Sequence, residues 1–343
     1  MSTRNFKQIL PVLSDYRRDM IAEGASFPLP LLTCPNGGWL SALPPPPSNR
    51  TGWPWTIQTP PLVADVARNS PVISIVIPSF RQARYVEEAL RSVLLQNYPR
   101  LELIVIDGES TDGSRAVLER YRPWISHLRI APDRGQAHAI NLGFSLASDD
   151  GLRAWLNSDD FYLPAAFQIV AEAHRCKSAD FIYGDQLVLK QETGELVCEA
   201  FPPALDRYLK FPGILASHAS FWTASHHRPV WEEHHCAIDY ELWIRLLPGT
   251  RRAYIPHPLG LVRHHDEAKT FSPAMALSWE EDAARNALAH PDLYRPRPWL
   301  NLEHRLLKGF LRRSRAGRIV RNLEAIRQRC AWPQGSPVPS HVS

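Results

Sequence analysis

A chain of 343 residues with 44% hydrophobic and 22% charged side chains has an ordinary globular composition. It can hold one large α/β domain of about 200–250 residues with appendages. The formal net charge of +4 suits anionic substrates or an acidic membrane surface but is too small to indicate nucleic acid.

The N-terminus has no apolar run before a small-residue cleavage site, and no apolar stretch approaches the roughly 18 residues that cross a bilayer. The five cysteines are scattered without a metal-knuckle spacing, so we expect reduced thiols in a soluble or peripheral cytoplasmic protein.

Residues 1–70 are irregular and rich in proline. Four consecutive prolines, Pro44 to Pro47, favour an extended conformation and exclude a helix. Trp53 and Trp55 flank Pro54, and such large side chains usually pack against a neighbouring domain. We therefore expect an N-terminal arm that lies on the main domain rather than a ligand site.

A repeating strand–helix pattern begins at Pro71. Residues 72–77 form a short β-branched run, which is typical of a strand buried on both faces. A helical stripe follows over residues 85–96, then a second apolar strand over residues 101–106 and a second helix from Ser114. This order predicts a mostly parallel sheet with helices on both faces.

The loops after the first two strands, residues 78–80 and 107–112, fall where such sheets bind ligands, beyond the carboxyl ends of the strands. Asp107 ends the second strand, where an acidic side chain can accept hydrogen bonds from a base or a ribose hydroxyl. The alternative is a helix-entry turn, a capping role that one of residues 110–112 can fill instead. Asp107 is therefore a candidate binding residue.

The chain after about residue 160 is less regular. We expect a helix near residues 165–175, a strand over residues 180–183, a helix across residues 240–247, and helical then disordered chain over residues 280–343. The predicted divisions are the arm (1–70), the α/β domain (71–275) and a C-terminal helical extension with a disordered tail (276–343).

Two adjacent carboxylates, Asp159 and Asp160, follow an apolar segment that ends at Trp155-Leu156. Like charges this close repel unless a cation neutralises them. Hard oxygen ligands suit Mg²⁺ or Mn²⁺, which would bridge to a diphosphate. An isolated pair of this kind is most often a solvated turn. We favour a metal site here because the pair follows a buried-looking segment and accompanies the loops described above.

Five short motifs follow one another between residues 71 and 270. They are Ile77-Pro78-Ser79-Phe80, Asp107-Gly108-Glu109-Ser110-Thr111-Asp112, Asp133-Arg134-Gly135-Gln136, Leu156-Asn157-Ser158-Asp159-Asp160 and Ile238-Asp239-Tyr240-Glu241-Leu242-Trp243. Each is weak alone, but the ordered set resembles the family 2 glycosyltransferases, which have the GT-A fold. The resemblance implies an α/β fold with a mixed, mostly parallel central sheet flanked by helices and a Rossmann-like nucleotide-binding half.

The resemblance also assigns roles to individual residues. It implies that the donor, a nucleoside-diphosphate sugar with UDP favoured, is bound by Pro78, Ser79, Phe80, Asp107, Arg134 and Asp159. Among these, Pro78 and Asp107 match nucleoside-binding positions, Arg134 matches a position that approaches the diphosphate, and Asp159 matches the ribose-side carboxylate. Asp160 matches the metal-binding carboxylate for Mn²⁺ or Mg²⁺.

The family's general base is an aspartate in an acidic motif just before a helix, and Asp239 fits that position. An inverting displacement needs such a base to take the proton of the acceptor hydroxyl. The alternative is that Asp239 caps the helix and Glu241 is a solvated charge in its first turn. We place Asp239 first as the catalytic residue and Glu241 second.

Residues 263–270 resemble the family's late Arg-x-His loop, which closes over the nucleotide. His265 fits the position that reaches the metal or diphosphate, with His264 as the alternative. Lys269 could pair with phosphate as a point charge. Surface exposure is the competing interpretation of this His-His pair.

Four further polar residues are weaker candidates. Asp185 follows a short strand and could bind a sugar or acceptor hydroxyl, although a turn aspartate fits nearly as well. His138 and Asn141 could face the donor from the helix after Arg134, or lie on its surface. His218 falls where the acceptor cleft is expected.

The Gln-x-x-Arg-Trp motif of processive family members is absent near residues 270–300. With no predicted membrane span, this indicates a single-transfer enzyme. The resemblance implies a glycan or glycolipid acceptor in bacterial surface polymer synthesis. The stretch from Arg305 to Arg329 mixes arginines with apolar residues and has two interpretations. It is either a peripheral membrane helix or a helix packed on the domain with its arginines in water.

Two other functions compete with transfer. A sugar-phosphate nucleotidyltransferase would share the fold and the metal, but it normally has a glycine-rich loop after the first strand, and residues 78–82 hold no glycine. A non-catalytic sugar-nucleotide or glycan-binding relic is disfavoured because Asp107, Asp159, Asp160 and Asp239 are all retained.

Overall fold

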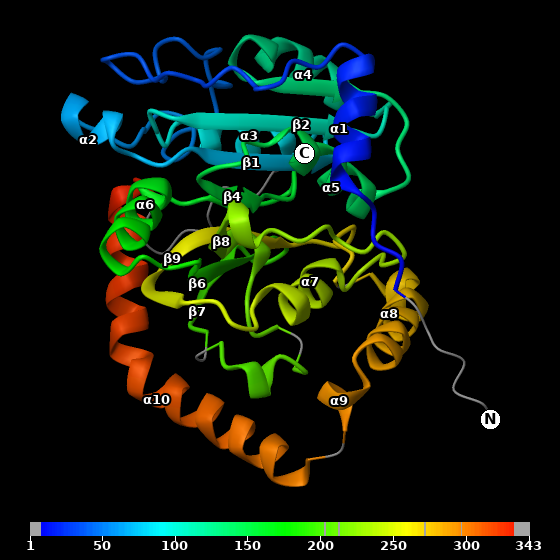
Figure 1. The fold of residues 1–343 in the computed structure, drawn as a ribbon. Helices are drawn as coiled ribbons and strands as arrows, with labels where there is room; N and C mark the ends of the chain where they lie inside the picture. The colour runs from blue at the N-terminus through cyan, green and yellow to red at the C-terminus, as the bar shows by residue number, and fades with distance from the viewer. Residues whose placement is uncertain (1–7, 202–203, 212, 271, 296, 333–343) are drawn as a thin grey trace.

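The computed structural model describes residues 8–201, 204–211, 213–270, 272–295 and 297–332. Within them one nine-stranded sheet has the order β3-β2-β1-β4-β8-β6-β9-β5, with β7 paired to β6. Figure 1 shows the strands one below another from β2 to β7, with the long helix α10 along the lower left edge.

The first half of the sheet is parallel. β1 (Ile73–Ser79) lies between β2 (Leu101–Asp107) and β4 (Leu152–Trp155), and β3 (His127–Ile130) lies outside β2. Every residue of β1 and β2 is buried, as expected for apolar runs covered by helices on both faces.

Crossover helices connect these parallel strands. They are α3 (Val86–Leu94), α4 (Ser114–Tyr121) and α5 (Gln136–Leu146), with the 3-10 turn η1 (Arg122–Trp124) after α4. α5 approaches β1 closely because it carries Gly143 there: a Cβ at this position would lie 2.4 Å from Cγ1 of Val76.

The second half of the sheet is mixed. β8 (Ser220–Thr223) pairs antiparallel with β4 and with β6 (Phe181–Lys190), and β6 pairs in parallel with β9 (Arg252–His264) along its whole length. The remaining strands are β5 (Phe161–Tyr162), antiparallel to β9, and β7 (Glu195–Glu199), antiparallel to β6. The helices of this half are α6 (Ala166–Lys177) and α7 (Ile238–Leu246), and the 3-10 turns are η2 (Asp206–Tyr208), η3 (Ser217–Ala219) and η4 (Ala224–His226).

A buried aromatic cluster attaches α7 to the middle of the sheet. The Trp243 ring of α7 stacks on the Trp155 ring at the end of β4, with centroids 5.7 Å apart and planes 9° apart. Trp222 of β8 meets both rings edge-on. Asp239 lies one turn before Trp243 and so on the same side of α7. The cluster therefore turns Asp239 toward the end of β4.

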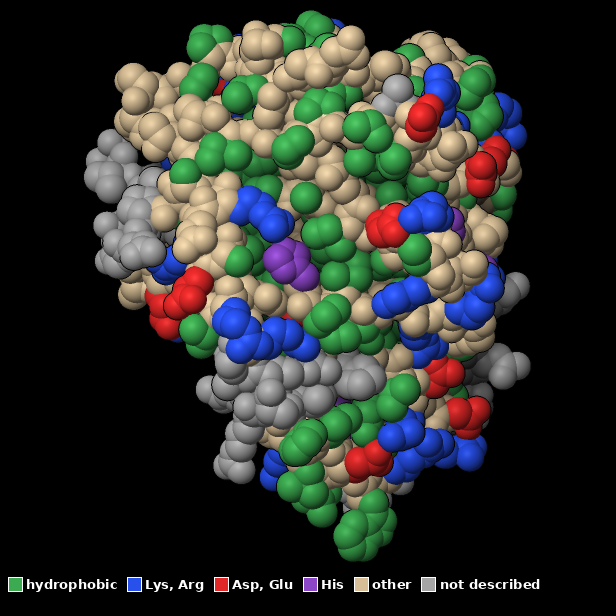
Figure 2. Space-filling model, turned by 90° about the vertical axis from the view of Figure 1, so that its left-hand side faces the viewer, with side chains coloured by type: hydrophobic (Ala, Val, Ile, Leu, Met, Phe, Trp, Pro, Cys, Tyr) green, Lys and Arg blue, Asp and Glu red, His purple; other side chains and the backbone are tan. Residues whose placement is uncertain are grey.

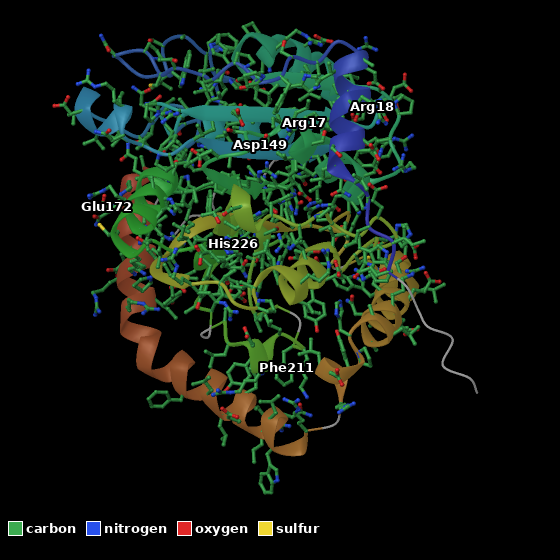
Figure 3. The ribbon with its side chains drawn as sticks, viewed as in Figure 1. Arg17, Arg18, Asp149, Glu172, Phe211 and His226 are labelled. Atoms are coloured by element: carbon green, nitrogen blue, oxygen red, sulfur yellow. The ribbon has the colours of Figure 1, made fainter. Side chains whose placement is uncertain are left out.

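The N-terminal arm packs on the α/β domain and holds two helices, α1 (Leu13–Ala22) and α2 (Ala64–Arg68). α1 lies against α5, and Figure 3 shows Arg17 beside Asp149, to which it donates two hydrogen bonds of 2.8 and 3.1 Å. Trp53 and Trp55 are buried, which confirms that these side chains pack on the domain. The sequence did not predict α1, because a short helix with a polar outer face has a weak periodic signal.

The C-terminal extension consists of η5 (Pro273–Met275), α8 (Ala276–Ala289), α9 (Pro291–Tyr294) and α10 (Pro298–Arg329). Ile326, Cys330 and Trp332 at its far end are buried against the core. Among the described residues, no helix combines the length and apolar composition needed to cross a bilayer. From residue 333 on, the tail predicted to be disordered lies outside the described residues.

The elements predicted from periodicity are confirmed. The strands at residues 72–77, 101–106 and 180–183 correspond to β1, β2 and β6, and the helices correspond to α3, α4, α6, α7 and the C-terminal helices. The confirmed boundaries differ by a few residues at most, except that β6 runs on to Lys190 because it pairs with β7 and β9.

Candidate active site

The carboxyl ends of β1 and β2 lie side by side. Ser79 pairs in register with Asp107, and the Gly108 N–H donates to the Ser79 carbonyl at 2.9 Å. A side chain on Gly108 would meet the Phe80 ring and the Asp133 carboxylate, each at 3.1 Å. The loops after β1, β2 and β3 therefore converge here, at the edge where parallel sheets bind ligands.

Pro78, Ser79 and Phe80 lie at this edge, where the sequence placed them. Pro78 and Ser79 are the last residues of β1, and Phe80 follows with its side chain exposed. The Ser79 hydroxyl is buried and has no hydrogen-bond partner among the described residues. A buried hydroxyl without a partner is uncommon and marks a place where a ligand or water can bind.

Asp107 is fully buried at the end of β2. Its carboxylate accepts hydrogen bonds from the Ser110 N–H at 2.7 Å and the Ser110 hydroxyl at 2.8 Å. Asp112 takes the helix-entry role instead, because it accepts from the N–H and the hydroxyl of Ser114 at the start of α4. Asp107 thus shapes the loop that leaves β2.

Asp159 and Asp160 have different surroundings, although they are adjacent. The Asp160 carboxylate is enclosed: Oδ1 accepts from the Arg263 N–H at 3.2 Å, and Oδ2 lies 3.3 Å from Asn157 Nδ2. Burial and the neighbouring Asp159 charge raise the pKa of Asp160 well above its usual range. By contrast, the Asp159 side chain is 21% exposed, and its Oδ2 lies 3.2 Å from His265 Nε2.

His265 is held in place by its neighbours. Its ring packs on the Tyr85 ring, with centroids 4.9 Å apart. Arg263, two residues earlier, donates to the Asp159 carbonyl and to the Glu88 carboxylate. The alternative ligand, His264, ends β9 in register with Lys190. Among the described residues, the structure thus brings His265 into contact with the acidic pair.

Asp159 and His265 together offer the donors that a metal would need. A carboxylate oxygen and an imidazole nitrogen 3.2 Å apart suit Mn²⁺ or Mg²⁺, which keep several positions for water and phosphate oxygens. Among the described residues, no group of three His, Cys, Asp or Glu side chains forms a closed metal site. Two protein donors would leave the other positions of such a metal open to water or to a ligand.

A hydrogen-bond chain links the strand ends to the loop before α7. Gln136, at the start of α5, donates to the Asn157 side chain at 2.8 Å and accepts from Lys269 Nζ at 2.8 Å. Lys269 also donates to the His235 carbonyl at 3.1 Å. The late loop therefore crosses from the end of β4 toward Asp239.

Arg134 is exposed at the start of this edge but already has partners. Its guanidinium donates to Glu232 and to the Tyr16 hydroxyl, each at 2.6 Å, and Tyr16 donates to Glu232 at 2.8 Å. The Asn141 amide donates to Glu232 at 3.0 Å, and the His138 ring accepts from the Arg134 N–H at 3.1 Å. Asn141 and His138 therefore support this cluster.

Asp239 lies in the first turn of α7, which begins at Ile238 after the N-cap residue Ala237. The helix-cap interpretation of Asp239 is therefore wrong. Its Oδ1 accepts from the Tyr240 N–H at 2.7 Å, and burial raises the pKa of Asp239 to about 6. A half-buried carboxyl with a raised pKa is suited to act as a base near neutral pH.

Glu241, the second candidate for the catalytic residue, is not the solvated charge of the alternative interpretation. It is fully buried and accepts from Arg245 and from Gln8 of the N-terminal arm. Burial alone would raise the pKa of Glu241, but hydrogen bonds from Arg245 and His290 outweigh it and lower the pKa to about 2. Glu241 therefore serves as a structural anion.

Asp185 and His218 also differ from expectation. The Asp185 carboxylate is fully buried and accepts from Tyr254, Arg318 of α10 and the Phe201 N–H, so it attaches α10 to the sheet instead of facing a ligand. His218 is buried with its Nδ1 3.8 Å from Asp160, and burial lowers its pKa to about 4.

Residues 74–221 match the family model described as Glycosyl transferase family 2. This segment, from β1 to β8, resembles the family 2 glycosyltransferases, as its motifs predicted. An uncharacterized glycosyltransferase of Nostoc sp. is 34% identical over 104 residues, which cover 29% of this chain and 32% of the relative. The glucosyltransferase WfgD of Escherichia coli, named for a GlcNAc-diphosphoundecaprenol acceptor, is 28% identical over 123 residues, covering 36% and 48%.

The chain spans about a third of the length of the first curated relatives it matches. The crystal structure of Staphylococcus aureus TarS (residues 1–349) aligns at TM-score 0.47 and 16% identity, covering 65% of this chain and 73% of that one. The predicted fold class, a GT-A α/β fold with a sheet flanked by helices, is confirmed.

Sequence reasoning missed Glu232, Tyr16, Gln136 and Asn157 as parts of the site. Gln136 and Asn157 stand inside the quoted motifs, so their polar side chains were a usable signal. Glu232 and Tyr16 carry no motif. Only the packing of the arm and of the segment before α7 brings them to Arg134.

Proposed function

We propose that this chain transfers a sugar from a nucleoside-diphosphate sugar to a hydroxyl acceptor, by a metal-dependent, inverting and non-processive reaction. The observation that carries the proposal is the 3.2 Å contact between Asp159 and His265, at the edge where β1 and β2 end. The match of residues 74–221 to the family 2 model supports the class of reaction.

For the donor, we propose that Pro78, Ser79, Phe80 and Asp107 line the nucleoside end and that Arg134 reaches the diphosphate. UDP is the favoured nucleotide. The exposed guanidinium of Arg134 supports its role, because it can exchange one carboxylate partner for phosphate oxygens with similar geometry.

For the metal, we propose Asp159 and His265 as the protein ligands for Mn²⁺ or Mg²⁺. When bound, the metal would neutralise charge on the departing diphosphate. The sequence favoured Asp160 for this role, but its enclosure by Arg263 and Asn157 supports a positioning role, in which Asp160 holds β9 to the loop that carries Asp159.

For the base, we propose Asp239. Its carboxyl would accept the proton of the acceptor hydroxyl as the oxygen attacks the anomeric carbon, on the face opposite the diphosphate. The stacking of Trp243 on Trp155 supports this role, because it orients Asp239 toward the strand end that leads to Asp159.

For the acceptor, we propose a glycan or glycolipid of bacterial surface polymer synthesis, met at the inner face of the plasma membrane. The Escherichia coli relative WfgD, which is named for a diphosphoundecaprenol-linked acceptor sugar, supports a lipid-linked acceptor.

The test is donor turnover by wild type and Asp239→Asn. We expect wild type to consume a nucleoside-diphosphate sugar with Mn²⁺, and Asp239→Asn to lose about 10²–10⁴-fold in kcat, since the amide cannot accept the proton. Glu192→Gln, an exposed carboxylate outside the site, is the control and should keep wild-type turnover. Wild-type activity in Asp239→Asn would remove Asp239 from the mechanism, and release of pyrophosphate from a nucleoside triphosphate and a sugar phosphate would indicate a nucleotidyltransferase.

A further inference from the structure

The first half of α10 has one face that the described part of the protein leaves uncovered. Its four large apolar side chains are exposed: Trp299 (81%), Leu302 (44%), Leu306 (64%) and Phe310 (67%). Their spacings of three and four residues place them on one side of the helix. Figure 2 shows hydrophobic side chains gathered at the lower tip of the molecule, where Figure 1 places this end of α10.

The opposite side of this half is attached to the domain through η2 and the segment after it. Glu303 accepts from Arg207 at 2.8 Å and from the Tyr208 hydroxyl at 2.7 Å. The His304 ring stacks on Phe211, which Figure 3 labels beside α10, with centroids 4.1 Å apart and planes 9° apart. These contacts fix the rotation of the helix, so the apolar face points away from the domain.

Positive charge accompanies this face. Nine arginine and lysine residues and two glutamates lie between Pro298 and Arg329, whereas the whole chain has a formal net charge of only +4. The rest of the chain is therefore net acidic. On the exposed half, Arg297 and Arg305 are solvent-accessible, while the Glu303 charge is paired with Arg207.

The apolar face and the positive charge together indicate what kind of partner binds this side of α10. A helix with Trp, Phe and Leu on one face and cations beside them is suited to the boundary between headgroups and acyl chains of an anionic bilayer. A second copy of this chain would bring two strongly positive helices together, which like-charge repulsion disfavours.

We propose that the first half of α10 binds the surface of an anionic membrane, with Trp299, Leu306 and Phe310 inserted and the neighbouring arginines at lipid phosphates. The inference rests on the proposed function only in that a lipid-linked acceptor would be met at this surface. In this proposal α10 has two parts: its C-terminal end packs on the core, and its N-terminal half faces lipid.

The test is co-sedimentation of the full chain with vesicles of phosphatidylcholine alone or mixed with phosphatidylglycerol, at low and physiological salt. We expect binding to the anionic vesicles to exceed binding to the neutral ones, to weaken as salt is raised, and to fall about tenfold in Trp299→Ser/Phe310→Ser. The matched control is Val63→Ser/Val66→Ser, which removes two exposed valines at the start of α2 and should bind like wild type.

Equal binding to both kinds of vesicle, or unchanged binding by Trp299→Ser/Phe310→Ser, would overturn the proposal. Light scattering adds a second check, since a dimer that this double variant dissociates would make a second copy the occupant. Donor turnover without vesicles separates this inference from the proposed function. A chain that binds anionic vesicles as expected but consumes no donor would keep the membrane face and lose the transferase.

Discussion

At the scale of single residues, the role that we propose for the Asp239 carboxyl predicts how activity depends on pH. Burial raises its pKa from 3.8 to about 6, so the basic form dominates above pH 6 and is lost below it. The neighbouring Glu241 shifts in the opposite direction, to about 2, because Arg245 donates to it. Two acidic residues in one helical turn therefore have separate roles that are set by their surroundings.

We predict that kcat/KM of wild type rises about tenfold per pH unit below pH 6 and levels off above it, as the base loses its proton. The raised pKa also means that stability is lost as pH rises from about 4 through 6, because the folded state disfavours the charged form. Asp239→Asn should therefore melt no lower than wild type at pH 8. A pH–rate profile and melting curves at pH 5 and 8 measure both effects, and a lower melting temperature for the variant at pH 8 would indicate a structural role for Asp239.

At the scale of elements, α7 is held by a buried ion pair within the helix. Glu241 and Arg245 are four residues apart, and the Glu241 side chain has no exposed surface. Gln8 reaches the same carboxylate from the N-terminal arm, and His290 approaches it from the end of α8. The helix that carries Asp239 is thus attached to both terminal segments through one anion.

We predict that Glu241→Gln lowers the free energy of unfolding by about 3–5 kcal/mol, because it leaves the Arg245 cation buried without its counter-charge. The stabilisation by Glu241 should be present above about pH 4.5 and be lost as pH falls toward 2. Urea unfolding at pH 7 and pH 3 measures this, with Glu192→Gln as the exposed control. A Glu241→Gln variant as stable as wild type but inactive would instead make Glu241 the better candidate base.

At the scale of the whole molecule, the N-terminal arm meets the C-terminal end of the described chain. The Trp53 N–H donates to the Cys330 carbonyl at 2.9 Å, and the Trp332 indole donates to the Trp53 carbonyl at 3.1 Å. Gly52 has no room for a side chain, since a Cβ there would lie 2.6 Å from the Cys330 carbonyl. The arm and the far end of α10 therefore stabilise each other over the core.

We predict that Trp332→Ala lowers the free energy of unfolding by about 3–5 kcal/mol, because it leaves a cavity where the two segments meet. Trp299→Ala, which removes a tryptophan of α10 that is 81% exposed, should change it by less than about 0.5 kcal/mol. Denaturant titration of both variants compares them directly. Equal losses would show that Trp299 and Trp332 are packed alike.

The sequence alone determined the parallel half of the sheet and the polar residues at its edge. Apolar runs such as residues 72–77 and 101–106 can be buried only as strands covered on both faces, and their ends place Ser79 and Asp107 together. Tertiary structure decided which carboxylates are enclosed by other side chains and which stay partly exposed. Asp160 and Asp185 look as available in sequence as Asp159, yet contacts with Arg263 and Arg318, 103 and 133 residues away in the chain, enclose them. Local patterns specify strands and their ends, whereas burial and pairing depend on residues that only the folded chain brings together.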